Sequence, residues 1–143
     1  MSGKKFLLIV LSMLLGLSFV GCRNKTVSKR ALEDDITHEL PFVVRLTNTY
    51  TMDLAENGNG FNVKMTLKYN ECDNEENCRL IASGFLNSLR DVEGITGVDA
   101  TFVNYDESFS SRIKIDNWED EKDKVFDKDK LKLVDVKDLK KTT

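Results

Sequence analysis

A strict alternation of apolar and polar residues runs from Phe61 to Tyr69 and is the clearest pattern in the chain. An alternation with a period of two is typical of a β-strand that has one buried and one exposed face. A less regular alternation from Val44 to Met52 precedes it, and two Asn-Gly pairs between the two segments favour a tight turn. The pattern therefore predicts a β-hairpin.

The apolar residues change to a helical period after this hairpin. Between residues 73 and 92 they recur every three or four positions, which predicts an amphipathic helix. Asp73 and Glu76 have the spacing of a capping box at its start, and Gly94 is placed to end it. A shorter helix is expected over residues 31–40, before the only proline of the chain.

Two further alternating segments, residues 98–102 and 109–116, predict a second pair of strands, and apolar residues between 131 and 136 favour a fifth strand. One apolar helix face and one apolar sheet face together predict an α+β fold. We expect a two-layer sandwich in which one main amphipathic helix packs across an antiparallel sheet of four or five strands.

The first 22 residues have a different pattern. Lys4 and Lys5 precede an almost unbroken apolar run over residues 6–20, which ends in Gly21 and Cys22. A basic start, a short apolar run and a small residue before the cleavage site are typical of a secretory signal peptide. The run is shorter than a comfortable membrane span. The alternative is an uncleaved N-terminal anchor helix.

The last residues of this segment, Val20, Gly21 and Cys22, resemble the lipobox of bacterial lipoproteins, and Phe19 stands where that family usually has an aliphatic residue. The resemblance implies that Cys22 carries a diacylglycerol and an N-acyl lipid such as palmitate, and that residues 1–21 are removed. Several acyl chains anchor a protein stably, whereas one holds it only marginally. The implied location is the cell membrane, on its extracytoplasmic side, or the outer membrane of a double-membrane bacterium.

The rest of the chain divides into three predicted parts. Residues 22–35 are rich in charged and small polar side chains and are expected to form a lipidated tether. Residues 36–118 carry the predicted α+β domain, and residues 119–143 form a densely charged tail with room for the extra strand. This order of elements is similar to that of small cystatin-like or ferredoxin-like lipoprotein domains.

The charge balance restricts the partners. The formal net charge is −3, and it falls to about −5 when Lys4 and Lys5 leave with the signal peptide. Nucleic-acid binding needs a basic footprint. The charge balance therefore argues against a nucleic-acid partner. The partners that the lipobox resemblance implies are membrane lipid, through the anchor, and another envelope protein.

Cys72 and Cys78 would be exported into oxidising surroundings, which favours a disulfide bond between them. Their spacing sets a geometric condition, because seven consecutive helical residues place the end Cα atoms about 9 Å apart. That distance exceeds disulfide reach, so the following helix is expected to begin near Asn77 if the bond forms. Metal binding by the two thiols is the alternative, although nearby histidines to complete a zinc site are absent from the sequence.

The sequence gives little support to catalysis. His38 is the only histidine, so no second one is present to pair with a serine or cysteine nucleophile. The carboxylate pairs stand in charged runs, which are typical of a solvated face. We expect no enzyme activity, no metal site and no cofactor besides the lipid on Cys22.

The remaining candidate chemistry is surface recognition. The polar side of the predicted sheet carries a set of basic and aromatic residues, which are common binding anchors. The sequence predicts a non-catalytic envelope lipoprotein that binds another protein, in exclusion, in immunity or as an accessory of an envelope complex. The alternative is a small-molecule binder with an apolar pocket between helix and sheet. The residues of the candidate surface are Lys64, Lys68, Arg112, Lys114 and Trp118.

Overall fold

The computed structural model describes residues 27–41, 44 and 49–142. The predicted signal peptide and Cys22 lie outside the described residues, as does part of the segment predicted to form the first strand. None of the described helices is long and apolar enough to cross a membrane.

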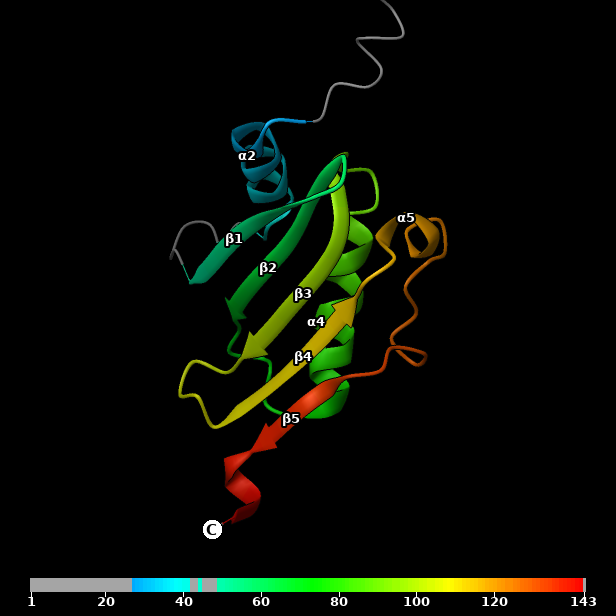
Figure 1. The fold of residues 1–143 in the computed structure, drawn as a ribbon. Coiled ribbons are helices and arrows are strands. Elements are labelled where there is room, and N and C mark those ends of the chain that lie inside the picture. Colours follow the sequence, from blue (N-terminus) through cyan, green and yellow to red (C-terminus); the bar gives the residue numbers. More distant parts are fainter. Residues whose placement is uncertain (1–26, 42–43, 45–48, 143) are drawn as a thin grey trace, which may run out of the picture.

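Five strands form one open sheet in which each strand lies next to its neighbour in the sequence (Figure 1). The predicted α+β class is confirmed, and so are the hairpin and the fifth strand. The strands are β1 (Tyr50–Asn57), β2 (Gly60–Lys68), β3 (Ile95–Val103), β4 (Phe109–Ile115) and β5 (Val134–Asp138).

The sheet is mixed, which corrects the expectation of a wholly antiparallel sheet. Three neighbouring pairs are antiparallel, but β2 and β3 run parallel, from the pair Phe61 and Ile95 to the pair Lys68 and Val103. The helix α4 (Glu75–Ser88) connects these two strands. A crossover through a helix returns the chain to the same end of the sheet, which is the connection that parallel strands require.

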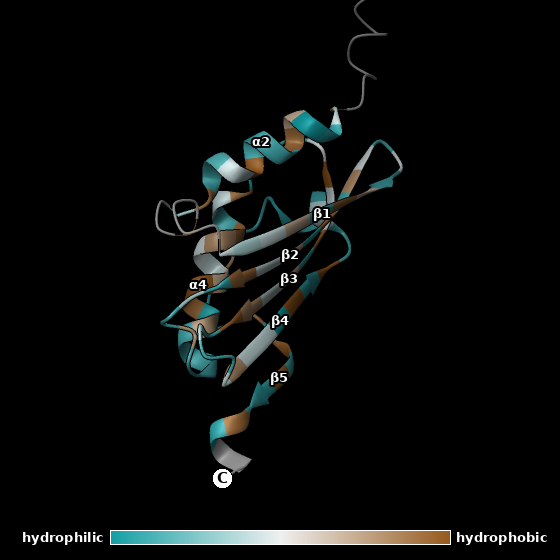
Figure 2. Cartoon of the chain, turned by 90° about the vertical axis from the view of Figure 1, so that its left-hand side faces the viewer, coloured by the Kyte–Doolittle hydropathy of each residue, from teal (hydrophilic) through white to brown (hydrophobic). Residues whose placement is uncertain are grey.

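The helix α4 forms the second layer. It lies behind the sheet in Figure 1, so that view looks onto the face of the sheet that α4 leaves uncovered. The turned view in Figure 2 shows α4 to one side of the stacked strands. Its apolar stripe of Cys78, Ala82, Phe85 and Leu86 is buried, and Phe85 meets Phe102 of β3 edge to face with ring centroids 5.8 Å apart.

The helix α2 (Lys29–Glu39) lies beside β1 and begins earlier than predicted (Figure 1). The Ser28 hydroxyl accepts a hydrogen bond from the Ala31 N–H at 3.1 Å, which caps the helix. Leu32 and Ile36 are fully buried in the core. The second half of the predicted tether, residues 29–35, is therefore part of the folded unit.

Cys72 and Cys78 form the predicted disulfide bond, with their Cα atoms 5.0 Å apart. The helix begins at Glu75, two residues before the predicted start, and the condition on geometry is still met because Cys72 lies outside the helix. The Cys72 N–H bonds the Tyr69 carbonyl in a turn that brings this cysteine back over Cys78. Asn74 caps the helix, where the sequence suggested Asp73.

The segment after β4 packs against the core, where the sequence predicted a charged tail. It begins with α5 (Trp118–Glu121), and the ring of Trp118 stacks on that of Phe126 at 5.4 Å. The side chain of Asn87 on α4 makes two hydrogen bonds to the backbone of Phe126. It accepts one from the Phe126 N–H at 2.9 Å and donates one to the Phe126 carbonyl at 3.0 Å. Arg90 donates to the Lys122 carbonyl at 2.7 Å. The folded unit therefore extends well beyond residue 118.

Candidate functional site

Three of the predicted surface residues meet on the uncovered face of the sheet. Side chains of a strand alternate between its two faces, and Lys64 and Lys114 fall on the face opposite the buried apolar positions. The strand register places two aspartates in line with these two lysines across β1 to β4, in the order Asp53, Lys64, Asp99 and Lys114. Negative and positive charges alternate along this row, which we call the charged row.

Arg112 adds a fixed positive charge next to this row. Its guanidinium donates two hydrogen bonds of 2.6 Å to the carboxylate of Asp99 on β3, and a third of 3.0 Å to Asp135 on β5. The hydrogen bonds from Arg112 hold the pKa of the Asp99 carboxyl below its usual range. The same contacts raise the pKa of Arg112. Both groups are therefore charged throughout the neutral range.

Lys68 and Trp118 do not join this group. Lys68 lies at the far end of β2 and makes an ion pair of 3.6 Å with Glu107. Trp118 is completely buried, which makes its assignment to the binding surface wrong. The alternation that would place it on the exposed face stops when β4 ends at Ile115, and α5 turns its ring inward onto Phe126. The described residues offer no hydrogen-bond partner to its Nε1 atom.

A shallow hollow of about 200 Å³ lies along the charged row, toward the β1–β2 turn. Its shape depends on Gly97, where a Cβ atom would lie 2.6 Å from the Oδ1 of Asn62. That oxygen accepts from Thr96 at 3.0 Å and from Asn57 at 3.2 Å. A small polar cluster therefore closes one end of the hollow, and Lys114 lines its other side.

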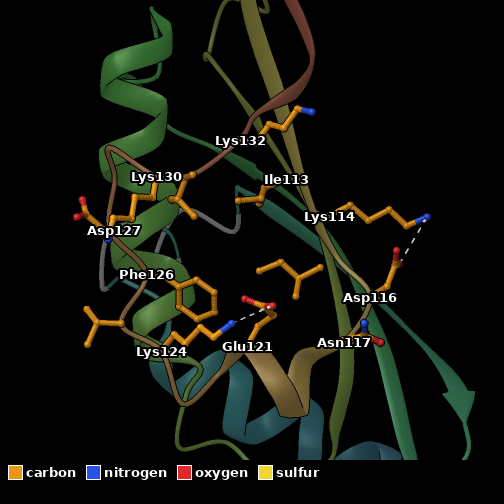
Figure 3. A pocket seen from close by; sticks show the side chains of 13 residues that line it. Ile113, Lys114, Asp116, Asn117, Glu121, Lys124, Phe126, Asp127, Lys130 and Lys132 are labelled. Atoms are coloured by element: carbon orange, nitrogen blue, oxygen red, sulfur yellow. Dashed lines mark ion pairs between the residues drawn. The ribbon is translucent and has the colours of Figure 1, made fainter.

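A larger cavity of about 640 Å³ lies at the edge of β4 and was not predicted from the sequence. Figure 3 shows its two walls, with Ile113 and Lys114 on the strand side and Phe126 and Lys130 on the segment that follows α5. The isolated apolar residues in the charged tail were the available sequence signal. Leu131, which lines this cavity, is one of them.

Charged side chains surround this apolar lining. Lys114 pairs with Asp116 at 3.8 Å, and Lys124 pairs with Glu121 at 3.6 Å, both drawn in Figure 3. Two further lysines of the rim, Lys130 and Lys132, have no carboxylate partner within the described part of the chain. Asp127 also lines the cavity (Figure 3), so four lysines stand against three carboxylates, and the rim carries a small excess of positive charge whereas the whole chain is negative.

His38 lies in a separate hollow of about 410 Å³ between α2 and the segment after α4. Asp35, Glu39, Asp91 and Glu93 also line this hollow. Within the described ranges, no three histidine, cysteine or acidic side chains are placed to hold a metal ion.

No family model, no curated protein and no solved structure matches this chain. The α+β class does not by itself indicate a function, because one fold class hosts many functions.

Proposed function

We propose that this protein is a membrane-anchored envelope lipoprotein whose folded domain binds another protein without catalysing a reaction. The observation that carries the proposal is the charged row, Asp53, Lys64, Asp99 and Lys114, on a sheet face that α4 leaves uncovered. An ordered pattern of both signs selects a complementary surface and disfavours others, since like charges placed opposite each other are costly.

The short connection to the proposed anchor supports a partner in the envelope. The lipid would be attached to Cys22, and the folded unit begins with the cap residue Ser28. Even when fully extended, the residues between them reach only about 20 Å. The domain would therefore stay close to the membrane surface, where a partner must also lie. Exclusion, immunity and support of an envelope complex are the roles that fit this position.

Charge reversal on the row tests protein binding. The full-length lipidated chain is expressed in its own cells, crosslinked gently and recovered from detergent extracts. We expect a discrete partner that is lost from the double variant Lys64→Glu, Lys114→Glu. The matched control is Arg79→Glu, a charge reversal on the exposed side of α4, which should leave recovery unchanged. Equal recovery from all three chains would refute the proposed surface, and recovery of no partner would refute the function.

The cavity beside β4 supports a second candidate, the binding of a small molecule. Its volume of about 640 Å³ falls within the range of about 300–1,000 Å³ that is usual for ligand sites. It lies at a sheet edge, away from the helix–sheet interface where the sequence placed such a pocket. Enhanced fluorescence of anilinonaphthalene sulfonate with the native chain, reduced by Lys130→Glu, would favour this candidate.

A further inference from the structure

The edge of β4 is only partly paired. β5 pairs with it from Phe109 to Arg112, and the register shifts within that stretch. Asp135 adopts a positive φ of 51°, an uncommon conformation for a residue with a side chain, at this register shift, and the pairing ends one residue further on, at Val134 and Arg112. Residues 113–115 of β4 therefore have no strand beside them on this edge in the described part of the chain.

The backbone of Lys114 faces this unpaired edge. The Phe109 carbonyl bonds Asn104 on the β3 side at 2.9 Å, and the Ser108 carbonyl bonds Leu139 on the β5 side at 2.9 Å. In an antiparallel strand, both backbone groups of a residue point to the same side, and the side alternates from one residue to the next. The N–H and C=O of Lys114 consequently point away from β3, as do those of Ser108.

The large cavity opens where these groups point. Lys114 and Ile113 form its strand wall, while Phe126 and Lys130 come from the facing segment (Figure 3). Proteins usually protect free strand edges by covering them, because an open edge is a template for pairing. Here the facing segment stands off from the edge and leaves about 640 Å³ between the two walls.

We propose that this edge accepts an extended segment of the partner protein, which pairs with Lys114 as an added strand and places an apolar side chain in the cavity. The inference rests on the proposed protein-binding function. The occupant should carry an acidic residue beside its apolar one, because the lysines of the rim outnumber its carboxylates by four to three. Lys130 and Lys132 have no ion-pair partner among the described residues. Backbone pairing would supply affinity, and the cavity and lysines would supply selectivity.

A synthetic peptide tests this mode of binding directly. The probe is an acetylated heptapeptide, Glu-Val-Asp-Phe-Glu-Val-Asp amide, titrated calorimetrically into the full-length lipidated chain in detergent micelles. Two N-methylated versions carry the methyl groups on alternate amides. Since a strand pairs through every second amide, one version should bind about tenfold more weakly and the other should bind like the parent. Equal binding of both versions would overturn strand addition.

A pair of variants at one position tests the edge of β4. Lys114→Pro removes the N–H that points to the free edge and leaves the bonds of the neighbouring residues to β3 in place, as proline on edge strands usually does. Lys114→Ala removes the same charge and keeps the N–H. We expect the proline variant to bind the parent peptide about tenfold more weakly than the alanine variant. Equal affinity of the two variants would place the peptide elsewhere.

The outcomes separate this inference from the proposed function. If crosslinking recovers a partner and the peptide does not bind, strand addition is wrong and protein binding stands. If crosslinking recovers no partner, the proposed protein-binding function is wrong, whether or not the peptide binds. If the chain forms dimers through this edge, which Lys114→Pro would abolish, the occupant is a second copy and the proposed partner segment is wrong.

Discussion

Arg112 on β4 donates a hydrogen bond of 2.6 Å to each carboxylate oxygen of Asp99 on β3. Its remaining guanidinium nitrogen bonds Asp135 on β5 at 3.0 Å. One side chain therefore ties three adjacent strands together on the uncovered face. The bond to Asp135 also holds β5 against β4 next to the unpaired residues 113–115. Arg112 therefore supports both the charged row and the strand wall of the cavity.

The replacement Arg112→Ala should lower the free energy of unfolding by about 1–2 kcal/mol. Hydrogen bonds to charged groups contribute about 1.5–3 kcal/mol, and partial exposure of this pair reduces that value. The control Lys114→Ala removes a more exposed charge and should cost less than about 0.5 kcal/mol. Urea unfolding of the three chains measures both values. Equal losses for the two variants would contradict a structural role for Arg112.

The ionisation of the Asp99 carboxyl should make the free energy of unfolding depend on pH in the acidic range. Its pKa is lowered in the folded chain, chiefly by the hydrogen bonds from Arg112, so its ionised form stabilises the fold at neutral pH. That contribution is complete above the unfolded pKa of about 3.9 and is lost as the pH falls through the folded pKa. Urea unfolding between pH 6 and pH 2 should show a smaller decline for Asp99→Asn. An identical decline would contradict the pairing.

The stack of Phe126 on Trp118 tests whether the segment after α5 belongs to the folded domain. Phe126 is buried against Trp118, whereas its neighbour Val125 is 70% exposed. We expect Phe126→Ala to cost about 3 kcal/mol, as a buried aromatic usually does, and Val125→Ala to cost almost nothing. Thermal unfolding compares the two. If Phe126→Ala leaves the free energy of unfolding unchanged, the residues after α5 do not belong to the folded unit, and the domain boundary predicted from the sequence near residue 118 is correct.

The disulfide bond should stabilise a short loop. On the chain-entropy estimate, linking Cys72 and Cys78 contributes about 2 kcal/mol. The double variant Cys72→Ala, Cys78→Ala should lose about that amount in urea unfolding, together with a packing cost because both side chains are fully buried. Adding a reductant to the unfolding buffer should destabilise the parent chain and leave the double variant unchanged. A reductant effect on both chains would contradict this assignment.

Lipid attachment is tested separately from folding. Cells fed labelled palmitate should incorporate it into the chain, and Cys22→Ser should abolish the label, because the lipobox resemblance assigns every acyl chain to that cysteine. Cys72→Ala with Cys78→Ala is the control and should keep the label. Incorporation into Cys22→Ser would contradict the proposed anchor.

The apolar and polar pattern predicted the helices and strands well, because the burial of one face sets which positions of each element are apolar. The alternation from Phe61 to Tyr69 follows the pleat of β2, and it also placed Lys64 on the exposed face. The same alternation does not encode strand direction, so the parallel pairing of β2 and β3 was missed. Trp118 was misplaced because the alternation was extended past the end of β4, where the chain turns into α5.

The cavity could not be predicted from the local sequence pattern. Its walls come from β4 and from the segment around Phe126, which are brought together by hydrogen bonds from Asn87 on α4. Those contacts join residues far apart in the sequence. A charged stretch containing an isolated aromatic residue signals burial of that residue, but it does not say which surface the residue packs against.

Photocrosslinking in cells tests the central proposal, protein binding through the uncovered face, most directly. A photoreactive residue replaces Lys64 on the charged row, Lys130 on the cavity rim or the exposed Leu80 on α4, which is the control position. We expect the same envelope protein to crosslink from Lys64 and Lys130, and nothing specific from Leu80. Crosslinks from Leu80 alone, or from none of the three positions, would contradict the account.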